Sequence, residues 1–118
     1  MKKKRRLSRS VALRKRDRLL AQLPNLREVL RGSLVSRYRR CGRESCHCAQ
    51  PEDPGHGPVY ALMVTVAPKQ TVEVYVPREL KEDVEIWIEN FRKVRETLEE
   101  ISSLNRRLLK EKQLFPEE

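Results

Sequence analysis

Aromatic residues and methionine are scarce in this sequence of 118 residues. It contains two Phe, one Trp and two Met, and charged residues make up 36% of the chain against 38% for hydrophobic ones. A chain of this length predicts one small domain, and so polar a composition predicts a thin core. Small domains of this kind gain stability from a bound metal ion or from oligomerisation.

Signatures of several functional classes are also missing. No apolar run approaches the ~20 residues of a membrane span, so we expect no membrane partner and a cytoplasmic protein. The four Gly form no Gly-rich phosphate loop. A Ser-His-Asp arrangement would have to use His47 or His56, the only two histidines, and both lie in a cysteine-rich window. We therefore expect a protein that is not an enzyme.

That window reads Cys41-x4-Cys46-x-Cys48-x7-His56 and is the strongest signal in the chain. Three soft sulfur donors and one nitrogen, brought together by tight turns, are what tetrahedral Zn²⁺ requires. Gly42 follows the first Cys, and Pro and Gly residues surround His56, so the turns are supplied. The spacing predicts a structural zinc site with Cys41, Cys46, Cys48 and His56 as ligands.

Other interpretations of the window stay open. His47 competes with His56 as the fourth ligand, although its place between Cys46 and Cys48 favours a side chain that points away. Two of the thiols can form a disulfide, but the odd number of Cys and the very basic N-terminus, without a signal peptide, argue against a secreted disulfide scaffold. Unliganded thiols, a redox sensor, or a catalytic zinc with Glu44 beside a bound water are the remaining alternatives.

Positive charge is concentrated in the first part of the chain. Residues 1–48 carry 16 Lys and Arg against three acids, a net charge of +13, whereas residues 49–118 have a net charge of −4. A basic segment of this kind favours a polyanion, with DNA or RNA the first candidate, because phosphate neutralisation releases counterions. A DNA-binding protein would then be associated with the nucleoid. The predicted nucleic-acid contacts are Lys2, Lys3, Lys4, Arg5, Arg6, Arg9, Arg14, Lys15, Arg16, Arg18, Arg37, Arg39, Arg40 and Arg43.

Hydrophobic periodicity predicts an α+β fold: an N-terminal basic helix, a small three-stranded antiparallel sheet with a zinc knuckle, and a long C-terminal amphipathic helix. The three expected parts are residues 1–31, 32–77 and 78–118. The expected elements are a helix from Ser8 or Ser10 to Pro24, a short helix over 25–31, strands over 33–40, 59–66 and 71–76, and a helix from Glu79 to about Gln113. The strand over 71–76 alternates polar and apolar residues, which is typical of a half-buried strand.

The last helix carries a heptad pattern from Val84 to Leu108, with Asn105 at an a position. Two interpretations compete for its C-terminal half. It pairs with its twin in a homodimeric coiled coil, which we favour, or it packs on the N-terminal helix.

The segments Gly32-Ser33-Leu34-Val35-x-Arg37-Tyr38-x-x-Cys41-Gly42-x-x-x-Cys46-x-Cys48-Ala49, His56-Gly57-Pro58-x-Tyr60 and Tyr75-Val76-Pro77 resemble a small prokaryotic family of unassigned function. Its members are often encoded beside transposases and other mobile-element genes. The resemblance covers residues 32 to about 105 and implies that Cys41, Cys46, Cys48 and His56 are motif positions. It implies no activity. We expect a zinc-stabilised nucleic-acid-binding accessory protein of a mobile element or, alternatively, an interaction adaptor that recruits a partner such as a transposase through the heptad helix.

Overall fold

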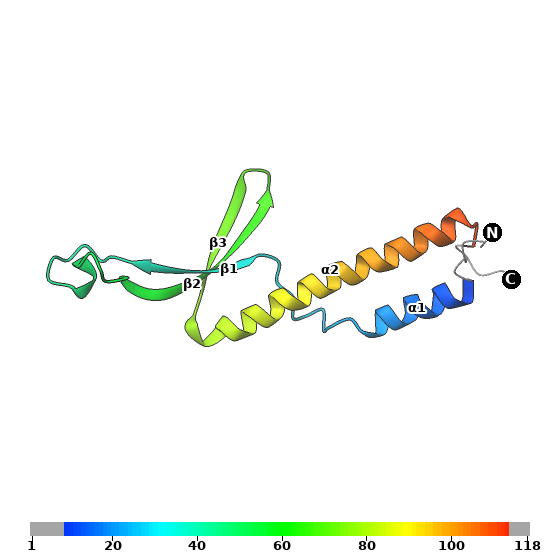
Figure 1. Cartoon of the computed structure of the whole chain (residues 1–118), viewed down its shortest axis with the longest axis horizontal. Helices are drawn as coiled ribbons and strands as arrows, with labels where there is room; N and C mark the ends of the chain where they lie inside the picture. Colours follow the sequence, from blue (N-terminus) through cyan, green and yellow to red (C-terminus); the bar gives the residue numbers. More distant parts are fainter. Residues whose placement is uncertain (1–8, 114–118) are drawn as a thin grey trace, which may run out of the picture. The chain divides into compact units, whose positions relative to one another are not determined.

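The computed structural model describes residues 9–113. It contains an N-terminal helix, a three-stranded antiparallel sheet and a long C-terminal helix, as the sequence predicted (Figure 1). The elements in chain order are α1 (Arg9–Ala21), β1 (Ser33–Arg39), the 3₁₀ turn η1 (His47–Ala49), β2 (His56–Ala67), β3 (Gln70–Val76), the 3₁₀ turn η2 (Arg78–Leu80) and α2 (Lys81–Lys110).

The sheet is a meander in the order β1-β2-β3, so the cysteine window joins its first two strands. Val35 lies opposite Ala61, and Ala61 lies opposite Tyr75 in β3. The register between β1 and β2 shifts between Arg37 and Arg39, immediately before the first cysteine. β2 is longer than the predicted strand and begins at His56, which places the candidate histidine ligand on the sheet itself.

The chain divides into two compact units, and α2 contributes to both. Residues 29–89 contain the sheet, the cysteine window and the first part of α2. Among the described residues, the helical unit consists of 9–28 and 90–113. The predicted three-part division of the chain stays a prediction.

The helical unit has a small core in which Ala12 of α1 and Leu104 and Leu108 of α2 are buried, with Leu13 and Leu19 packed around them. The guanidinium of Arg16 donates to Oδ1 of Asn105 at 2.9 Å. The sequence left open whether the long helix pairs with a second copy or packs on the N-terminal helix. Leu104 and Leu108 pack on the N-terminal helix, α1.

Two local predictions are wrong. Residues 25–31 contain a turn and irregular backbone instead of a short helix. Oδ1 of Asn25 accepts the backbone N–H of Arg27 at 3.0 Å, a local hydrogen bond that competes with helix formation. The predicted half-buried strand over 71–76 is also largely exposed: the side chains of Val72 and Val74 are 42% and 49% exposed, and only Val76 is buried.

Within the described part of the chain, no helix has the length and apolar character needed to span a membrane.

Candidate metal centre and basic surfaces

Four side chains converge where the loop between β1 and β2 meets the start of β2: those of Cys41, Cys46 and Cys48 in the loop and of His56 in β2. Their ligand atoms all lie within 4.8 Å of one another. Sγ of Cys41 is 3.5 Å from Sγ of Cys48, and Sγ of Cys46 is 3.1 Å from Nε2 of His56. Ligand atoms around a tetrahedral zinc ion lie about 3.5–3.8 Å apart, given Zn–S bonds of ~2.3 Å and Zn–N bonds of ~2.0–2.1 Å. These four residues can therefore bind a metal ion after small side-chain movements.

Local structure explains why the cysteines meet. The turn η1 carries Cys48 back toward the first cysteine, where Cys48 is buried and its Sγ accepts the backbone N–H of Cys41 at 3.3 Å. Gly55 sits close to β1, and a Cβ atom at that position would lie 2.8 Å from the carbonyl oxygen of Arg39. Its positive φ of 102° is also one that glycine tolerates best. This close approach brings His56 beside the cysteines.

The thiols have different ionisation tendencies. The backbone N–H of Arg43, followed by the side chain of His56, lowers the pKa of the Cys41 thiol to about 6. The backbone N–H of Cys41 lowers the pKa of Cys48, but burial and the neighbouring thiols together raise it above its usual value. A thiolate is the form that binds a metal ion, so the low pKa of Cys41 favours binding near neutral pH.

The ring of the other histidine, His47, lies edge-on against that of His56, with the centroids 4.7 Å apart, but its Nδ1 faces a carboxylate. Nδ1 of His47 lies 2.9 Å from Oδ2 of Asp53, and the His47 side chain is 61% exposed. Oδ1 of the same carboxylate accepts the backbone N–H of Gly55 at 2.8 Å. The Gly55 N–H, and after it His47, lower the pKa of Asp53. The structure thus groups His56 with the cysteines and pairs His47 with a carboxylate.

Arg40 organises the same loop, a role that the sequence analysis missed. Its guanidinium donates to the backbone carbonyl of Cys48, to that of Gln50 at 3.1 Å and to that of Asp53 at 2.7 Å. These bonds tie together the segment between the third cysteine and His56. The Asp53-Pro54-Gly55 sequence, a typical side-chain-to-backbone turn, was the available signal for the Asp53 contact.

We predict that Arg40→Ala weakens zinc binding by roughly 10–100-fold, the range typical of changes behind the ligands. Arg40→Lys should recover little of the lost zinc affinity, because one ammonium group does not reproduce a planar guanidinium that donates to three carbonyls. Competition with a chromogenic chelator measures the zinc affinity. Arg27→Ala, an exposed arginine outside the loop, is the control, and equal affinities for all variants would contradict the assigned role.

The other predicted basic contacts fall into three groups. Lys2, Lys3, Lys4, Arg5 and Arg6 lie outside the described residues. Arg9 and Arg16 of α1 are partly buried, and Arg37 is paired with Glu73 at 2.6 Å. The exposed remainder consists of Arg14, Lys15 and Arg18 on α1 and of Arg39 and Arg43 on either side of Cys41.

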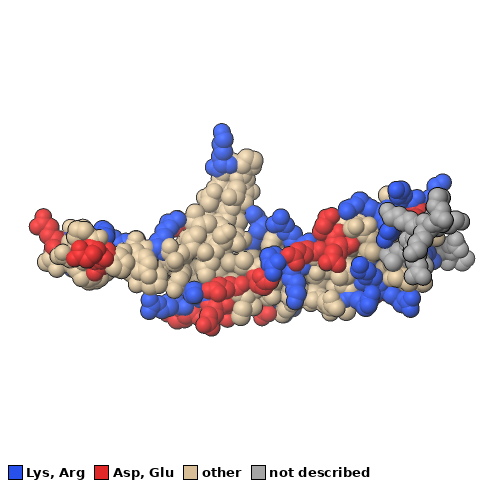
Figure 2. All heavy atoms as spheres, in the orientation of Figure 1, with Lys and Arg blue, Asp and Glu red and all other residues tan. Residues whose placement is uncertain are grey.

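Arg18 follows Arg14 by four residues and Lys15 by three, so the three side chains project from one side of α1. We call these three residues the α1 cationic face. In the space-filling view, Lys and Arg side chains form patches among uncharged residues in the region of α1 (Figure 2).

A family model for a domain of unknown function, DUF6788, matches residues 10–85. The chain therefore belongs to this family of unassigned function, which agrees with the resemblance found from the motif residues. Comparison with curated proteins and with solved structures gives no significant match.

Proposed function

We propose that this protein is a zinc-stabilised nucleic-acid-binding protein that acts as an accessory factor, with a binding role and no catalysis. The observation that carries the proposal is the α1 cationic face, three exposed positive side chains on a helix with no acidic residue in its first turn. Phosphate contacts from such a face give affinity without sequence readout.

The candidate metal centre supports the same proposal from the other unit of the chain. Arg39 and Arg43 are exposed and lie two residues before and two residues after Cys41. A bound Zn²⁺ would hold the backbone at Cys41, and so limit where these two guanidinium groups can reach. Their fixed positions would favour contacts with successive phosphates, because less side-chain entropy is lost on binding.

The proposal is tested by titrating labelled DNA and RNA, single-stranded and duplex, with the full chain over a range of salt concentrations. We expect the logarithm of the association constant to fall linearly with the logarithm of salt concentration, with a slope of about −0.7 to −0.9 for each phosphate contacted. Absence of binding at low salt to all four nucleic acids would refute the proposal. The association with a mobile element is a further part of it that rests on the family resemblance alone.

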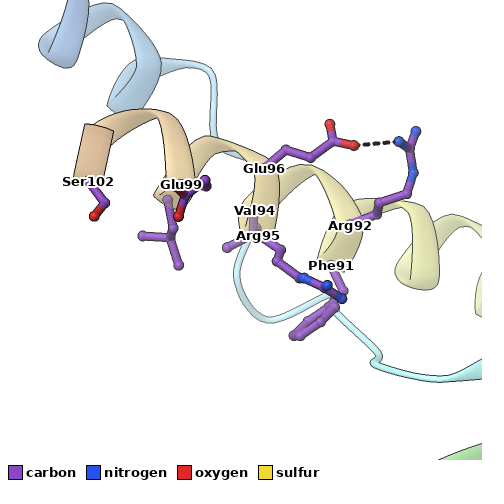
Figure 3. Close-up of a pocket in the computed structure, with 8 residues that line it drawn as sticks. Phe91, Arg92, Val94, Arg95, Glu96, Glu99 and Ser102 are labelled. Carbon is purple, nitrogen blue, oxygen red and sulfur yellow. Dashed lines mark hydrogen bonds and ion pairs between the residues drawn. The ribbon is translucent and has the colours of Figure 1, made fainter. Parts of the chain in front are cut away.

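A second candidate function is self-association through α2, supported by an open groove along that helix. Phe91, Val94 and Leu98 line it, together with Ser102 (Figure 3). Leu98 is 56% exposed, and nearby Leu109 is 62% exposed. The core of the helical unit is small, so covering this groove with α2 of a second copy would bury apolar surface that one chain leaves in water.

The Leu98→Glu variant tests self-association by sedimentation equilibrium. The unchanged chain should be dimeric and the variant monomeric. If the unchanged chain is a monomer, the homodimer is refuted. The α2 groove would then have to be tested with a protein partner such as a transposase.

A further inference from the structure

An open groove lies between β1, β2 and the start of α2, within the unit formed by residues 29–89. Two tyrosines line it, Tyr38 from β1 and Tyr60 from β2, together with Ser36 of β1, Pro58 of β2 and Lys81 of α2. Tyr60 is paired with Ser36, two residues before Tyr38, so the tyrosines belong to neighbouring strands and lie close along the groove.

Tyr38 is half exposed, with 52% of its surface accessible. The ring rests over Gly57, since a Cβ atom at that glycine would lie 3.2 Å from Cδ1 of Tyr38. One part of the ring is therefore supported by the backbone, and a large part of its surface faces solvent.

The position of Tyr38 depends on the candidate metal centre. Gly57 directly follows His56, and Tyr38 precedes Cys41 by three residues. A metal ion held by His56 and Cys41 would therefore fix the two segments that meet at the Tyr38 ring. Such a fixed, exposed aromatic ring can stack on a planar ligand with little loss of conformational entropy.

One positive side chain, that of Lys81, lines the groove beside the acidic Glu85. Nζ of Lys81 lies 5.3 Å from the centroid of the Tyr60 ring and 3.0 Å from a carboxylate oxygen of Glu85. Lys81 therefore covers Tyr60, and Tyr38 is the ring left open to a ligand.

We propose that this groove binds an unpaired base of a single-stranded nucleic acid, which stacks on the ring of Tyr38. The inference rests on the proposed nucleic-acid-binding function and specifies the form of the ligand. Stacking on an aromatic side chain tolerates every base, because each base has a π face. Bases inside a duplex are already stacked and paired, so duplex binding should not use the groove.

The test compares Tyr38→Leu with Tyr75→Leu in the full chain. Tyr75 is a matched control, because it is 67% exposed and lies opposite Ala61, on the other face of the sheet from Tyr60. The probes are a labelled short oligothymidine, its abasic counterpart of equal length and a duplex. We expect Tyr38→Leu to weaken oligothymidine binding by roughly tenfold while leaving abasic-strand and duplex binding unchanged. Tyr75→Leu should change none of the three.

The outcomes separate this inference from the proposed function. Equal oligothymidine affinity for Tyr38→Leu and the unchanged chain, with salt-dependent binding retained, would overturn the stacking site alone. Failure of the unchanged chain to bind any probe would overturn both.

A Tyr38→Trp variant keeps the test decisive if the leucine variant does not fold. Its indole ring should retain binding, and its fluorescence should be quenched by oligothymidine but not by the abasic strand. The unchanged chain, with Trp87 alone, gives the reference signal. Equal signals for the variant and the reference would refute stacking at this position.

Discussion

A Cys48→Ser variant is expected to lose its bound zinc and to unfold the loop between β1 and β2. Cys48 is 1% exposed, and its Sγ contacts both the backbone N–H and the Sγ of Cys41. Structural zinc sites have apparent binding free energies of about 10–16 kcal/mol, comparable with the ~5–15 kcal/mol stability of a whole domain. Loss of one thiolate should therefore remove a large share of the stability.

The unit formed by residues 29–89 has little else to stabilise it. Its buried apolar residues are Cys48, Ala61, Leu62 and Val76. We expect equimolar zinc in the unchanged chain, almost none in the variant, and a melting transition of the variant that is lower and broader. Elemental analysis and circular dichroism provide the two readouts.

His47→Ala is the matched control for this prediction. His47 lies between two of the cysteines, but its ring contacts Asp53, so the variant should retain equimolar zinc. Loss of zinc from the Cys48→Ser variant and retention of zinc by the His47→Ala variant together test the set of ligands. A Cys48→Ser protein with full zinc content and an unchanged melting temperature would contradict it.

Reversing the charge of the α1 cationic face should produce the largest effect on nucleic-acid binding. In the variant with Arg14, Lys15 and Arg18 all changed to Glu, three phosphate contacts are lost and three repulsive charges are introduced. We expect the association constant to fall at least 100-fold near physiological salt, and the magnitude of the salt slope to decrease by about 2.7 for duplex DNA, at about 0.9 for each contact.

The control variant changes Arg27, Arg78 and Lys93, which lie outside both α1 and the α2 groove, to Glu. These residues are also exposed, and the change in net charge is the same. If binding depends on the α1 cationic face, the control should retain most of the affinity and of the salt slope. Equal losses in the two variants would indicate an effect of total charge and would contradict an interface on α1.

The cysteine window was informative from the sequence because its ligands are close neighbours in the chain. Three thiols within eight residues, followed by a histidine among turn-forming residues, restrict the geometry before any tertiary packing is known. The role of Arg40 was not predictable in the same way. Its carbonyl partners extend from Cys48 to Asp53, and only the folded loop brings their oxygens to the guanidinium.

Hydrophobic periodicity predicted which faces of the strands and helices are apolar. It did not predict which other elements pack against those faces. The alternation over 71–76 correctly predicts a strand, yet Val72 and Val74 remain exposed, because alternation does not specify a second layer. The heptad pattern likewise predicts the long helix, but it does not specify its partner. Leu104 and Leu108 pack against α1 of the same chain, a contact between residues far apart in sequence.

X-ray absorption spectroscopy at the zinc edge, on the full chain purified in air, tests the central claim most directly. We expect one zinc ion per chain with three sulfur ligands at ~2.3 Å and one nitrogen ligand at ~2.0–2.1 Å. A protein purified without zinc, or a zinc ion surrounded only by nitrogen and oxygen ligands, would contradict it.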